Sequence, residues 1–284
     1  MTMPAEDPPR APEIPAPPPV LGTSEPSLVQ AGPTDAKPFL VEAGVVEARG
    51  TERGGIDSVV ASGIPVLADL RTDGGVGANV VLSPCSYRRE LVGARGSILE
   101  DVLVASAFPL VAVQWRPPPG APQLWSLEIG LTLCPGTRSL RHSTSPSGLR
   151  ALGNASPPTA VDLGFHPPPG ELTVTEAPDG GLAVQVRFAA AGPVTLLVSA
   201  GPVSGAPPVV TATPHLRAHE LRCAGDASDD GQATLITQTG VKEIDDGVAW
   251  AVYRLRAALQ RAGAKDRTEA LPSGGADLFW SGLG

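Results

Sequence analysis

Short apolar runs, rich in Val and Leu and separated by turn residues, recur along the chain from Phe39 onward. In the run GLAVQVRFA, large apolar side chains occupy every second position from Leu182 to Phe188. This alternation is typical of a β-strand with one face packed and the other in water. The sequences TDGG and PDGG between such runs are typical of turns. A long series of short strands joined by turns predicts a large antiparallel β-sandwich, so the expected fold class is mainly β.

The pattern changes to a helical one near the end of the sequence. The stretch VKEIDDGVAWAVYRLRAALQRAG carries apolar residues at three- and four-residue steps, which predicts a C-terminal amphipathic α-helix. Its apolar stripe consists of Ile244, Val248, Val252, Leu255, Leu259 and Ala262. Acidic residues near its start and arginines near its end both suit the helix dipole. Trp250 and Tyr253 lie off this stripe, so we expect the helix to have apolar neighbours on two sides.

Four segments follow from these patterns. Residues 1–37 contain ten prolines and few large apolar side chains, which predicts a disordered, proline-rich tail. Residues 38–207 hold the β-sandwich. Residues 208–240 form a linker, in which PHLRAHELRCAG predicts a short helix that begins at Pro214. Residues 241–284 contain the long helix and a glycine-rich stretch with an aromatic pair.

Composition and charge exclude several classes of partner. Gly and Pro supply 33 and 32 of the 284 residues, which favours strands and turns over a helical bundle. The formal net charge is −8 and basic residues cluster no further than pairs such as Arg88-Arg89, so we expect no nucleic-acid partner. We also expect no membrane partner, because an acidic chain is not drawn to anionic lipids and no apolar run is long enough to span a bilayer.

The cysteines and the N-terminal residues predict a cytoplasmic location. Cys85, Cys134 and Cys223 are odd in number and show no CxxC spacing, which suits free thiols in a reducing compartment. The first ten residues, MTMPAEDPPR, lack the basic region and apolar core of a secretory signal.

One group of residues has the side chains, but not the spacing, of a metal site. His215, His219 and Cys223 follow one another at four-residue steps. On a continuous helix the first and third would lie about 12 Å apart, which is too far to share one ion. His215 and His219 could bind zinc only with ligands from elsewhere. We therefore predict no metal and no cofactor, and leave binding by this histidine pair open.

No residue of this sequence is predicted to be catalytic. There is no GxSxG nucleophile motif. The glycine clusters at 74–77 and 201–205 lack a phosphate-loop lysine and are interpreted as hairpin turns. The adjacent carboxylates that could suit glycoside hydrolysis are Glu100–Asp101, Asp229–Asp230 and Asp245–Asp246. However, neighbouring residues on a strand point to opposite faces, and acidic residues at a helix start have capping and dipole roles.

Three stretches carry a resemblance to a known family: YRRELVGARGSILEDVLVASAFPLVAVQWR in the sandwich, DDGVAWAVYRLRAAL in the helix and DLFWSGLG after it. In this order they resemble bacterial glycogen-debranching-like glycoside hydrolases, in which an N-terminal β-sandwich precedes a six-hairpin (α/α) toroid. The resemblance implies that residues 38–207 are a mostly non-catalytic domain and that the helix with Trp250 and Tyr253 is the first toroid helix. In that family the catalytic acid and base come from later toroid helices, which this sequence lacks.

The resemblance further implies a domain or fragment that supports glycan hydrolysis and is not active alone. Phe279 and Trp280 lie in the segment that would enter the sugar cleft, so they are the candidate substrate-binding residues; packing against further toroid helices is the alternative for this pair. The implied partners are an α-glucan or other oligosaccharide, and a remaining toroid that is truncated from this chain or separately encoded.

Three alternatives stay open. A complete hydrolase with an unrecognised site would need convergent carboxylates that the sequence does not reveal. A free-standing carbohydrate-binding module would need aromatic platforms, and aromatic residues make up only 4% of the chain. A partner-binding β-sandwich, whose C-terminal helix docks on a separately encoded protein, would explain the second apolar face of that helix equally well.

Overall fold

The structure is a computed structural model of the chain. It describes residues 28–33, 37–43, 46–52, 54–61, 63–83, 86–93, 96–104, 110–117, 124–134, 141–153, 159–178 and 180–202, and residues 244, 247, 248, 250 and 251. The last five have helical backbone, and Ile244 among them is 51% exposed. No helix in these residues is long and apolar enough to cross a membrane.

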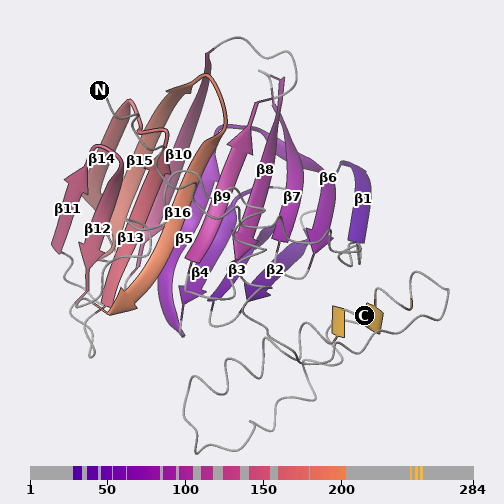
Figure 1. Cartoon of the computed structure of the whole chain (residues 1–284), viewed down its shortest axis with the longest axis horizontal. Helices are drawn as coiled ribbons and strands as arrows, with labels where there is room; N and C mark the ends of the chain where they lie inside the picture. The colour runs from indigo at the N-terminus through magenta and orange to yellow at the C-terminus, as the bar shows by residue number, and fades with distance from the viewer. Residues whose placement is uncertain are drawn as a thin grey trace, which may run out of the picture.

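Sixteen described strands form two antiparallel sheets, which confirms the predicted mainly β sandwich (Figure 1). The nine-stranded sheet has the order β1 (Leu28–Pro33), β6 (Val76–Ser83), β7 (Ser86–Gly93), β8 (Gly96–Val104), β9 (Leu110–Arg116), β16 (Val194–Pro202), β13 (Thr159–His166), β12 (Gly148–Leu152), β11 (Arg141–Ser145). The seven-stranded sheet has the order β14 (Glu171–Glu176), β15 (Leu182–Ala190), β10 (Trp125–Leu133), β5 (Ile64–Thr72), β4 (Ile56–Ala61), β3 (Val46–Thr51), β2 (Pro38–Ala43).

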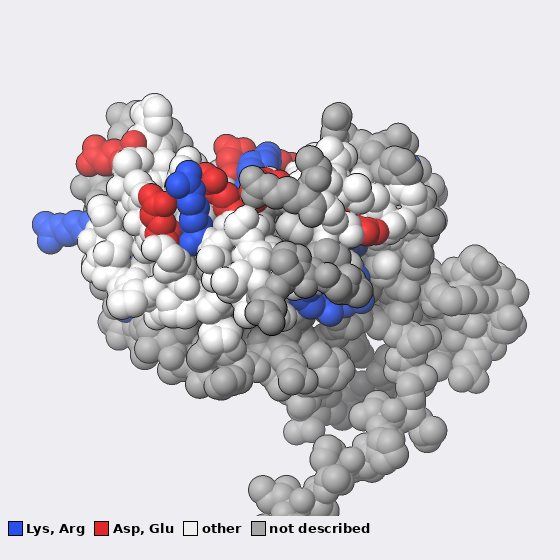
Figure 2. Space-filling model, turned by 90° about the horizontal axis from the view of Figure 1, so that it is seen from above, with Lys and Arg blue, Asp and Glu red and all other residues white. Residues whose placement is uncertain are grey.

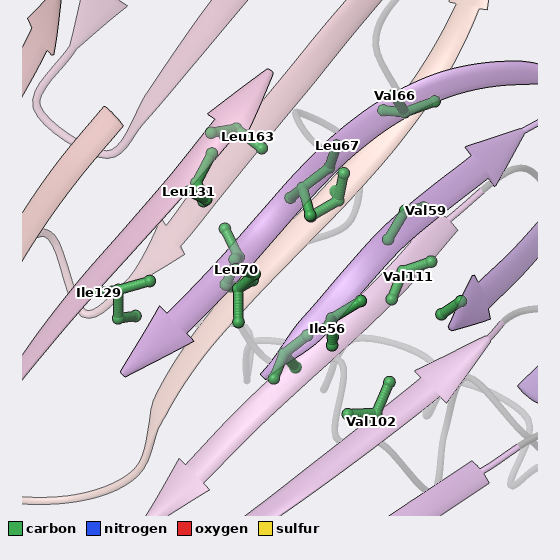
Figure 3. Packing of buried hydrophobic residues seen from close by; sticks show 14 of the residues in the cluster. Ile56, Val59, Val66, Leu67, Leu70, Val102, Val111, Ile129, Leu131 and Leu163 are labelled. Atoms are coloured by element: carbon green, nitrogen blue, oxygen red, sulfur yellow. The ribbon is translucent and has the colours of Figure 1, made fainter. Parts of the chain in front are cut away.

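The core lies between the two sheets and is built from the alternating apolar positions. Figure 3 shows Ile56 and Leu70 of the seven-stranded sheet with Val102 and Val111 of the other, all fully or almost fully buried. Burial of each such side chain contributes about 1.5–3 kcal/mol. Since one face of each strand supplies this core, the two-residue periodicity of the sequence fixes which face that is.

The outer faces of the two sheets differ in exposure. In β15 of the seven-stranded sheet, buried and more exposed residues alternate strictly, as expected for a face in water. In β13 and β16 of the nine-stranded sheet, by contrast, consecutive residues are buried, so both faces of these strands are covered. Near-continuous apolar runs are typical of strands covered on both faces.

Three strands, β1 (Leu28–Pro33), β11 and β12, lie where the sequence pattern did not place them. β1 falls inside the segment 1–37 that was assigned to the proline-rich tail, and it pairs with β6 at the edge of its sheet. Asn79 holds it there, because its side-chain oxygen accepts a hydrogen bond from the backbone N–H of Gly32 at 2.8 Å. The β11–β12 hairpin lies within residues 141–158, a Ser- and Pro-rich stretch in which we predicted no strand.

The glycine cluster at 74–77 is not the hairpin turn that its sequence predicted. It connects β5 of the seven-stranded sheet to β6 of the nine-stranded sheet, so the chain crosses from one layer to the other. Gly75 has φ +117, and a Cβ atom there would lie 2.3 Å from the carbonyl oxygen of Val92. The crossing therefore requires glycine at this position both for its backbone conformation and for close packing.

Candidate functional site

Most residues that the sequence singled out as site candidates lie outside the described residues. This applies to Phe279 and Trp280, and equally to the remaining candidates His215, His219, Cys223, Asp229, Asp230, Asp245 and Asp246. Among the residues that the structure describes, no group of three His, Cys, Asp or Glu side chains could hold a metal ion. The one candidate pair that can be placed is Glu100–Asp101 of β8.

Glu100 and Asp101 point to opposite faces of the sheet, as strand geometry requires. Glu100 lies opposite Arg89 of β7 and Trp115 of β9, inside the sandwich. Asp101 lies opposite Arg88 and Gln114, on the outer face. The two carboxylates therefore cannot act on one bond, and each has a separate electrostatic environment.

The inward carboxylate, Glu100, belongs to a fully buried ion pair. Its Oε1 atom lies 2.5 Å from Nη2 of Arg89, and neither side chain is exposed to solvent. The indole N–H of Trp115 donates a hydrogen bond to Oε2 of Glu100 at 2.8 Å. A carboxylate that is paired and hydrogen-bonded in this way has no free position for a substrate, so we assign Glu100 a structural role.

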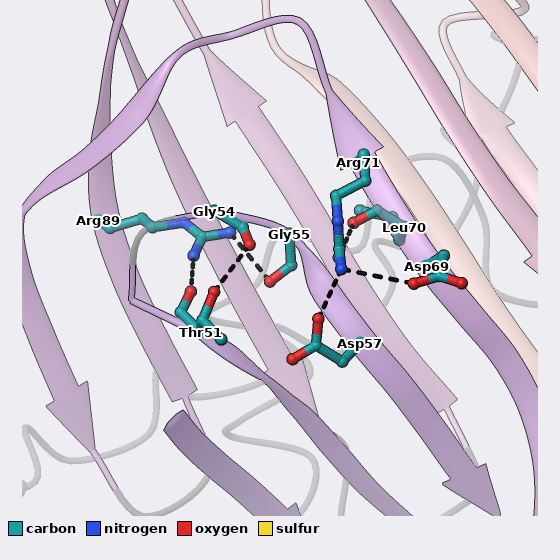
Figure 4. A network of polar contacts seen from close by, with 8 residues as sticks. All are labelled: Thr51, Gly54, Gly55, Asp57, Asp69, Leu70, Arg71 and Arg89. Carbon is teal, nitrogen blue, oxygen red and sulfur yellow. Dashed lines mark hydrogen bonds and ion pairs between the residues drawn. The ribbon is translucent and has the colours of Figure 1, made fainter. Parts of the chain in front are cut away.

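Arg89 links the two sheets through backbone carbonyl groups. Figure 4 shows its guanidinium group donating to the carbonyl oxygen of Thr51 at 2.5 Å and to that of Gly55 at 3.3 Å. Thr51 is the last residue of β3 and Gly55 directly precedes β4, both strands of the seven-stranded sheet, whereas Arg89 lies on β7 in the other sheet. The ion pair with Glu100 thus orients a group that ties the two layers together.

Two aromatic rings lie against this guanidinium group. Phe39 of β2 and Tyr87 of β7 stack with ring centroids 3.9 Å apart and an interplanar angle of 7°. The guanidinium carbon of Arg89 lies 5.9 Å from the centroid of Phe39 and 5.3 Å from that of Tyr87. Burial raises the pKa of the Tyr87 hydroxyl well above its ordinary value, although the nearby Arg89 charge opposes this shift. Tyr87 is therefore a neutral packing residue.

The outward carboxylate, Asp101, begins a row of polar side chains across the nine-stranded sheet. Its Oδ1 atom lies 2.5 Å from Nε of Arg88, and its Oδ2 atom pairs with Arg116. The row continues through Gln114, whose side-chain amide donates to the hydroxyl of Thr195 at 3.2 Å. These contacts occupy Asp101 with two arginines, so it is also unavailable as a free acid or base.

A second polar group lies further along the same outer face. Asp162 of β13 is directly opposite Ser199 of β16 and Arg150 of β12. Burial raises the pKa of the Asp162 carboxyl above its ordinary value. The charge of Arg150 acts in the opposite direction, but its Nε atom lies 3.8 Å from Oδ1 of Asp162. The hydroxyl of Ser199 is buried without a hydrogen-bond partner among the described residues. This group is therefore less fully paired than the one around Asp101.

The two outer carboxylates are too far apart to form a hydrolytic pair. Asp101 and Asp162 are separated by three strand spacings and by four positions along β16, counted from Thr195 to Ser199. With about 4.8 Å between strands and 3.4 Å per residue, they lie about 20 Å apart. Glycoside hydrolases need carboxyl groups about 5–10 Å apart. The described residues of this face thus offer no catalytic pair.

The outer face is buried both at these polar side chains and at the apolar side chains between them. We call this surface the outer patch; it is built from β8, β9, β16 and β13 and consists of Asp101, Leu103, Leu110, Ala112, Ala160, Asp162, Thr195, Leu197 and Ser199. Each of these residues is at most 9% exposed. Sequence analysis did not predict the burial of this outer patch. The available signal was the continuous apolar character of PLVAVQWR, TAVDLGF and GPVTLLVSAG, in contrast to the alternation of GLAVQVRFA.

Charged side chains on the other sheet form compensated clusters. Arg187 of β15 pairs with Glu128 of β10 at 3.3 Å and with Glu171 of β14 at 3.2 Å, and all three are exposed to solvent. Figure 2 shows acidic and basic side chains next to one another among the residues drawn in colour. Exposed pairs of this kind contribute little to stability.

No protein-family model and no curated protein matches this sequence. Among solved structures, the chain is similar to a GH92 family glycosyl hydrolase, ccman5, with 14% identity and a TM-score of 0.49, over 79% of this chain and 39% of that chain. It is similar to a bacterial glucoamylase complexed with acarbose, with 6% identity and a TM-score of 0.43, over 85% of this chain and 41% of that chain.

A third similar structure is a putative aldose 1-epimerase from Escherichia coli K12, with 8% identity and a TM-score of 0.43, over 59% of this chain and 100% of that chain. The chain spans 39% and 41% of the lengths of the two hydrolases.

Proposed function

We propose that this chain is a non-catalytic domain of a carbohydrate-active glycoside hydrolase of the glycogen-debranching-like type, and that it braces a helical catalytic toroid. The observation that carries the proposal is that the two placed candidate carboxylates, Glu100 and Asp101, are paired with arginines and point to opposite faces of the sheet. The described strands therefore supply no catalytic pair. The sequence resemblance of the sandwich and of the following helix supplies the class of enzyme.

The contacts of the described carboxylates favour a structural role over a catalytic one. Glu100 is paired with Arg89 and accepts a hydrogen bond from Trp115, and Asp101 is paired with two arginines. From the spacing of the strands and the rise per residue, Asp162 lies about 20 Å from Asp101. We therefore place the acid and base of the reaction on the toroid helices, in the same cytoplasmic compartment, with an α-glucan or other oligosaccharide as substrate.

The proposal is tested with the purified chain, short α-glucans and a polypeptide that carries the remaining toroid helices. Light scattering measures association, and release of glucose measures hydrolysis. We expect no glucose from the chain alone, a stable complex with the toroid polypeptide, and hydrolysis by the mixture. Glucose release by the chain alone would contradict a non-catalytic role. A chain that stays monomeric in the mixture would contradict the bracing role.

A partner-binding sandwich is the second candidate, and one observation favours it. Ile244 has helical backbone and is 51% exposed, so an apolar helical position is open to another protein. A carbohydrate-binding module receives no such support, because the described aromatic side chains are buried or half-buried and form no exposed platform. The mixture experiment separates the first two: a partner-binding sandwich forms a complex that leaves the α-glucans intact.

A further inference from the structure

We propose that β11 pairs antiparallel with β11 of a second copy of this chain, so that the nine-stranded sheet continues across a two-fold axis. The occupant of this sheet edge is thus the same strand of an identical molecule. The contact involves neither a glucan nor a toroid, so it does not rest on the proposed function.

The first observation is that β11 is an open edge. It is the outermost strand of its sheet, and among the described strands it pairs only with β12 (Figure 1). All of its residues, Arg141–Ser145, are exposed, as are Pro146 and Ser147 of the turn that follows. Hydrogen-bonded and non-hydrogen-bonded pairs alternate along an antiparallel ladder, so every second residue of an edge strand directs its backbone N–H and C=O groups outward. The outer side of β11 therefore presents the groups that a further strand would bind.

Each of the other three edge strands that the structure describes has a feature that opposes the addition of a strand. β1 has a register irregularity next to Pro33, a residue with no N–H group to donate. β2 is covered, since its residues Val41 and Glu42 are 0% and 2% exposed. β14 carries an exposed carboxylate at each end, Glu171 and Glu176. β11 contains no proline, no register shift and no carboxylate, so it is the least protected of these edges.

Symmetry determines how two copies of β11 can pair. Residues that lie opposite each other in an antiparallel pair have their side chains on the same face, and successive side chains of a strand alternate between faces. A two-fold axis between two copies must therefore pass through a residue, and an axis at Ser143 pairs all positions of the strand. Ser143 then lies opposite Ser143 of the second copy, His142 opposite Thr144, and Arg141 opposite Ser145.

The side chains that this register brings together are compatible. Arg141 carries the formal charge of β11, and it would lie opposite a serine. It would also be about 14 Å from Arg141 of the second copy, because the two are four residues apart along the strand direction. Like charges directly opposite one another would be unfavourable, and this register has none. An isologous contact needs such self-complementarity, which favours a second copy of the chain as the occupant of this edge.

The size of the contact predicts its strength. It consists of one short strand from each copy, whereas a standard stable interface buries about 1,600 Å² in total. We therefore expect a weak dimer that forms in a concentration-dependent way.

Sedimentation equilibrium of the purified full chain, over a wide range of concentration, measures this dimer. Because Ser143 faces itself across the axis, Ser143→Lys and Ser143→Asp each place two like charges opposite one another. We expect each variant alone to raise the Kd of the dimer at least about fivefold. An equimolar mixture of the two variants places Lys opposite Asp, and we expect it to regain a Kd at or below that of wild type.

Val92→Lys and Val92→Asp are the matched controls. Val92 is 49% exposed on β7, which lies six strands away from β11 in the same sheet. Neither control variant should change the Kd. Thermal unfolding of the Ser143 variants should match wild type, because Ser143 is already exposed.

Three results would each overturn the proposal. The first is a wild-type chain that stays monomeric at its highest soluble concentration. The second is a dimer that neither Ser143→Lys nor Ser143→Asp weakens, because its contact would lie elsewhere. The third is a mixture of the two variants that stays as weak as each variant alone, because Ser143 would then not face itself across the axis.

Discussion

Arg89 and Glu100 form an ion pair in which both side chains are fully buried, and removal of one charge leaves the other uncompensated. We expect Glu100→Gln to lower the free energy of unfolding by about 3–5 kcal/mol, since an unpaired buried charge is strongly unfavourable. The double variant Arg89→Met/Glu100→Leu removes both charges and is expected to recover part of that loss. Urea unfolding of Arg89→Met, Glu100→Leu and the double variant measures the coupling. Strictly additive losses would contradict a paired role.

Asp162 makes the stability of the fold depend on pH, because burial raises the pKa of its carboxyl in the folded chain. The folded state therefore binds the proton more tightly than the unfolded state does. Stability accordingly falls as the pH rises from the ordinary aspartate pKa of about 3.9 through the raised pKa. We expect Asp162→Asn to abolish this fall and to be slightly more stable near neutral pH, by less than about 1 kcal/mol.

The pH dependence of Asp162 is measured by urea unfolding of wild type and Asp162→Asn across that pH range. Asp101→Asn is the matched control on the same outer face, where two arginines hold the carboxylate. Its loss of ion pairs should lower stability at neutral pH, opposite in sign to Asp162→Asn. An Asp162→Asn variant less stable than wild type at neutral pH would contradict the assignment.

At the level of elements, the alternation of apolar residues was enough to predict the strands and the sandwich. It was not enough for β11, whose residues Arg141–Ser145 are all exposed and whose pairing depends on the apolar residues of β12. The turn motif at 74–77 predicted the local backbone conformation, but it did not predict that the next strand, β6, joins the other sheet. The burial of Arg89 and Glu100 could have been predicted, because each lies two positions away from inward-facing apolar residues of its own strand.

The connection between β5 and β6, which crosses from one sheet to the other, depends on Gly75. Comparison with Gly63 distinguishes the cost of backbone strain from the cost of a steric clash. Gly75 and Gly63 both have positive φ, +117 and +76, but a Cβ atom would clash with the Val92 carbonyl only at Gly75. At Gly63 nothing lies within 4 Å of that position. We expect Gly63→Ala to cost about 1 kcal/mol from strain and Gly75→Ala at least about 2 kcal/mol more. Thermal unfolding measures the difference; equal costs would contradict the close packing.

For the whole molecule, the asymmetry between its two outer faces matters more than any single residue. The seven-stranded sheet presents compensated ion pairs to solvent, whereas the nine-stranded sheet is buried on both sides at its centre. The sequence did carry a signal for that asymmetry, namely the continuous apolar character of TAVDLGF and GPVTLLVSAG, which a search for alternation alone does not detect. The candidate sugar-binding residues Phe279 and Trp280 lie outside the described residues, so their role stays a prediction of the sequence resemblance.

The partner-binding face of the helical residues gives the last prediction. Ile244 is 51% exposed, and a large apolar side chain in this position is suited to burial against a toroid helix. We expect Ile244→Asp to weaken the complex with the toroid polypeptide at least about tenfold, because it places a charge at an apolar contact. Thermal unfolding of the isolated variant should match wild type, since the side chain is already half in solvent.

The control for Ile244→Asp is Gln185→Asp, which adds the same charge on the exposed face of β15. Titration calorimetry with the toroid polypeptide compares both variants with wild type. Weakened binding by Ile244→Asp alone places the interface on the helix. Equal weakening by both variants would show that added negative charge, and not the helical position, controls the association. Unchanged affinity of Ile244→Asp would exclude Ile244 from the interface. In either of those cases Ile244 does not carry the proposed contact with a catalytic toroid.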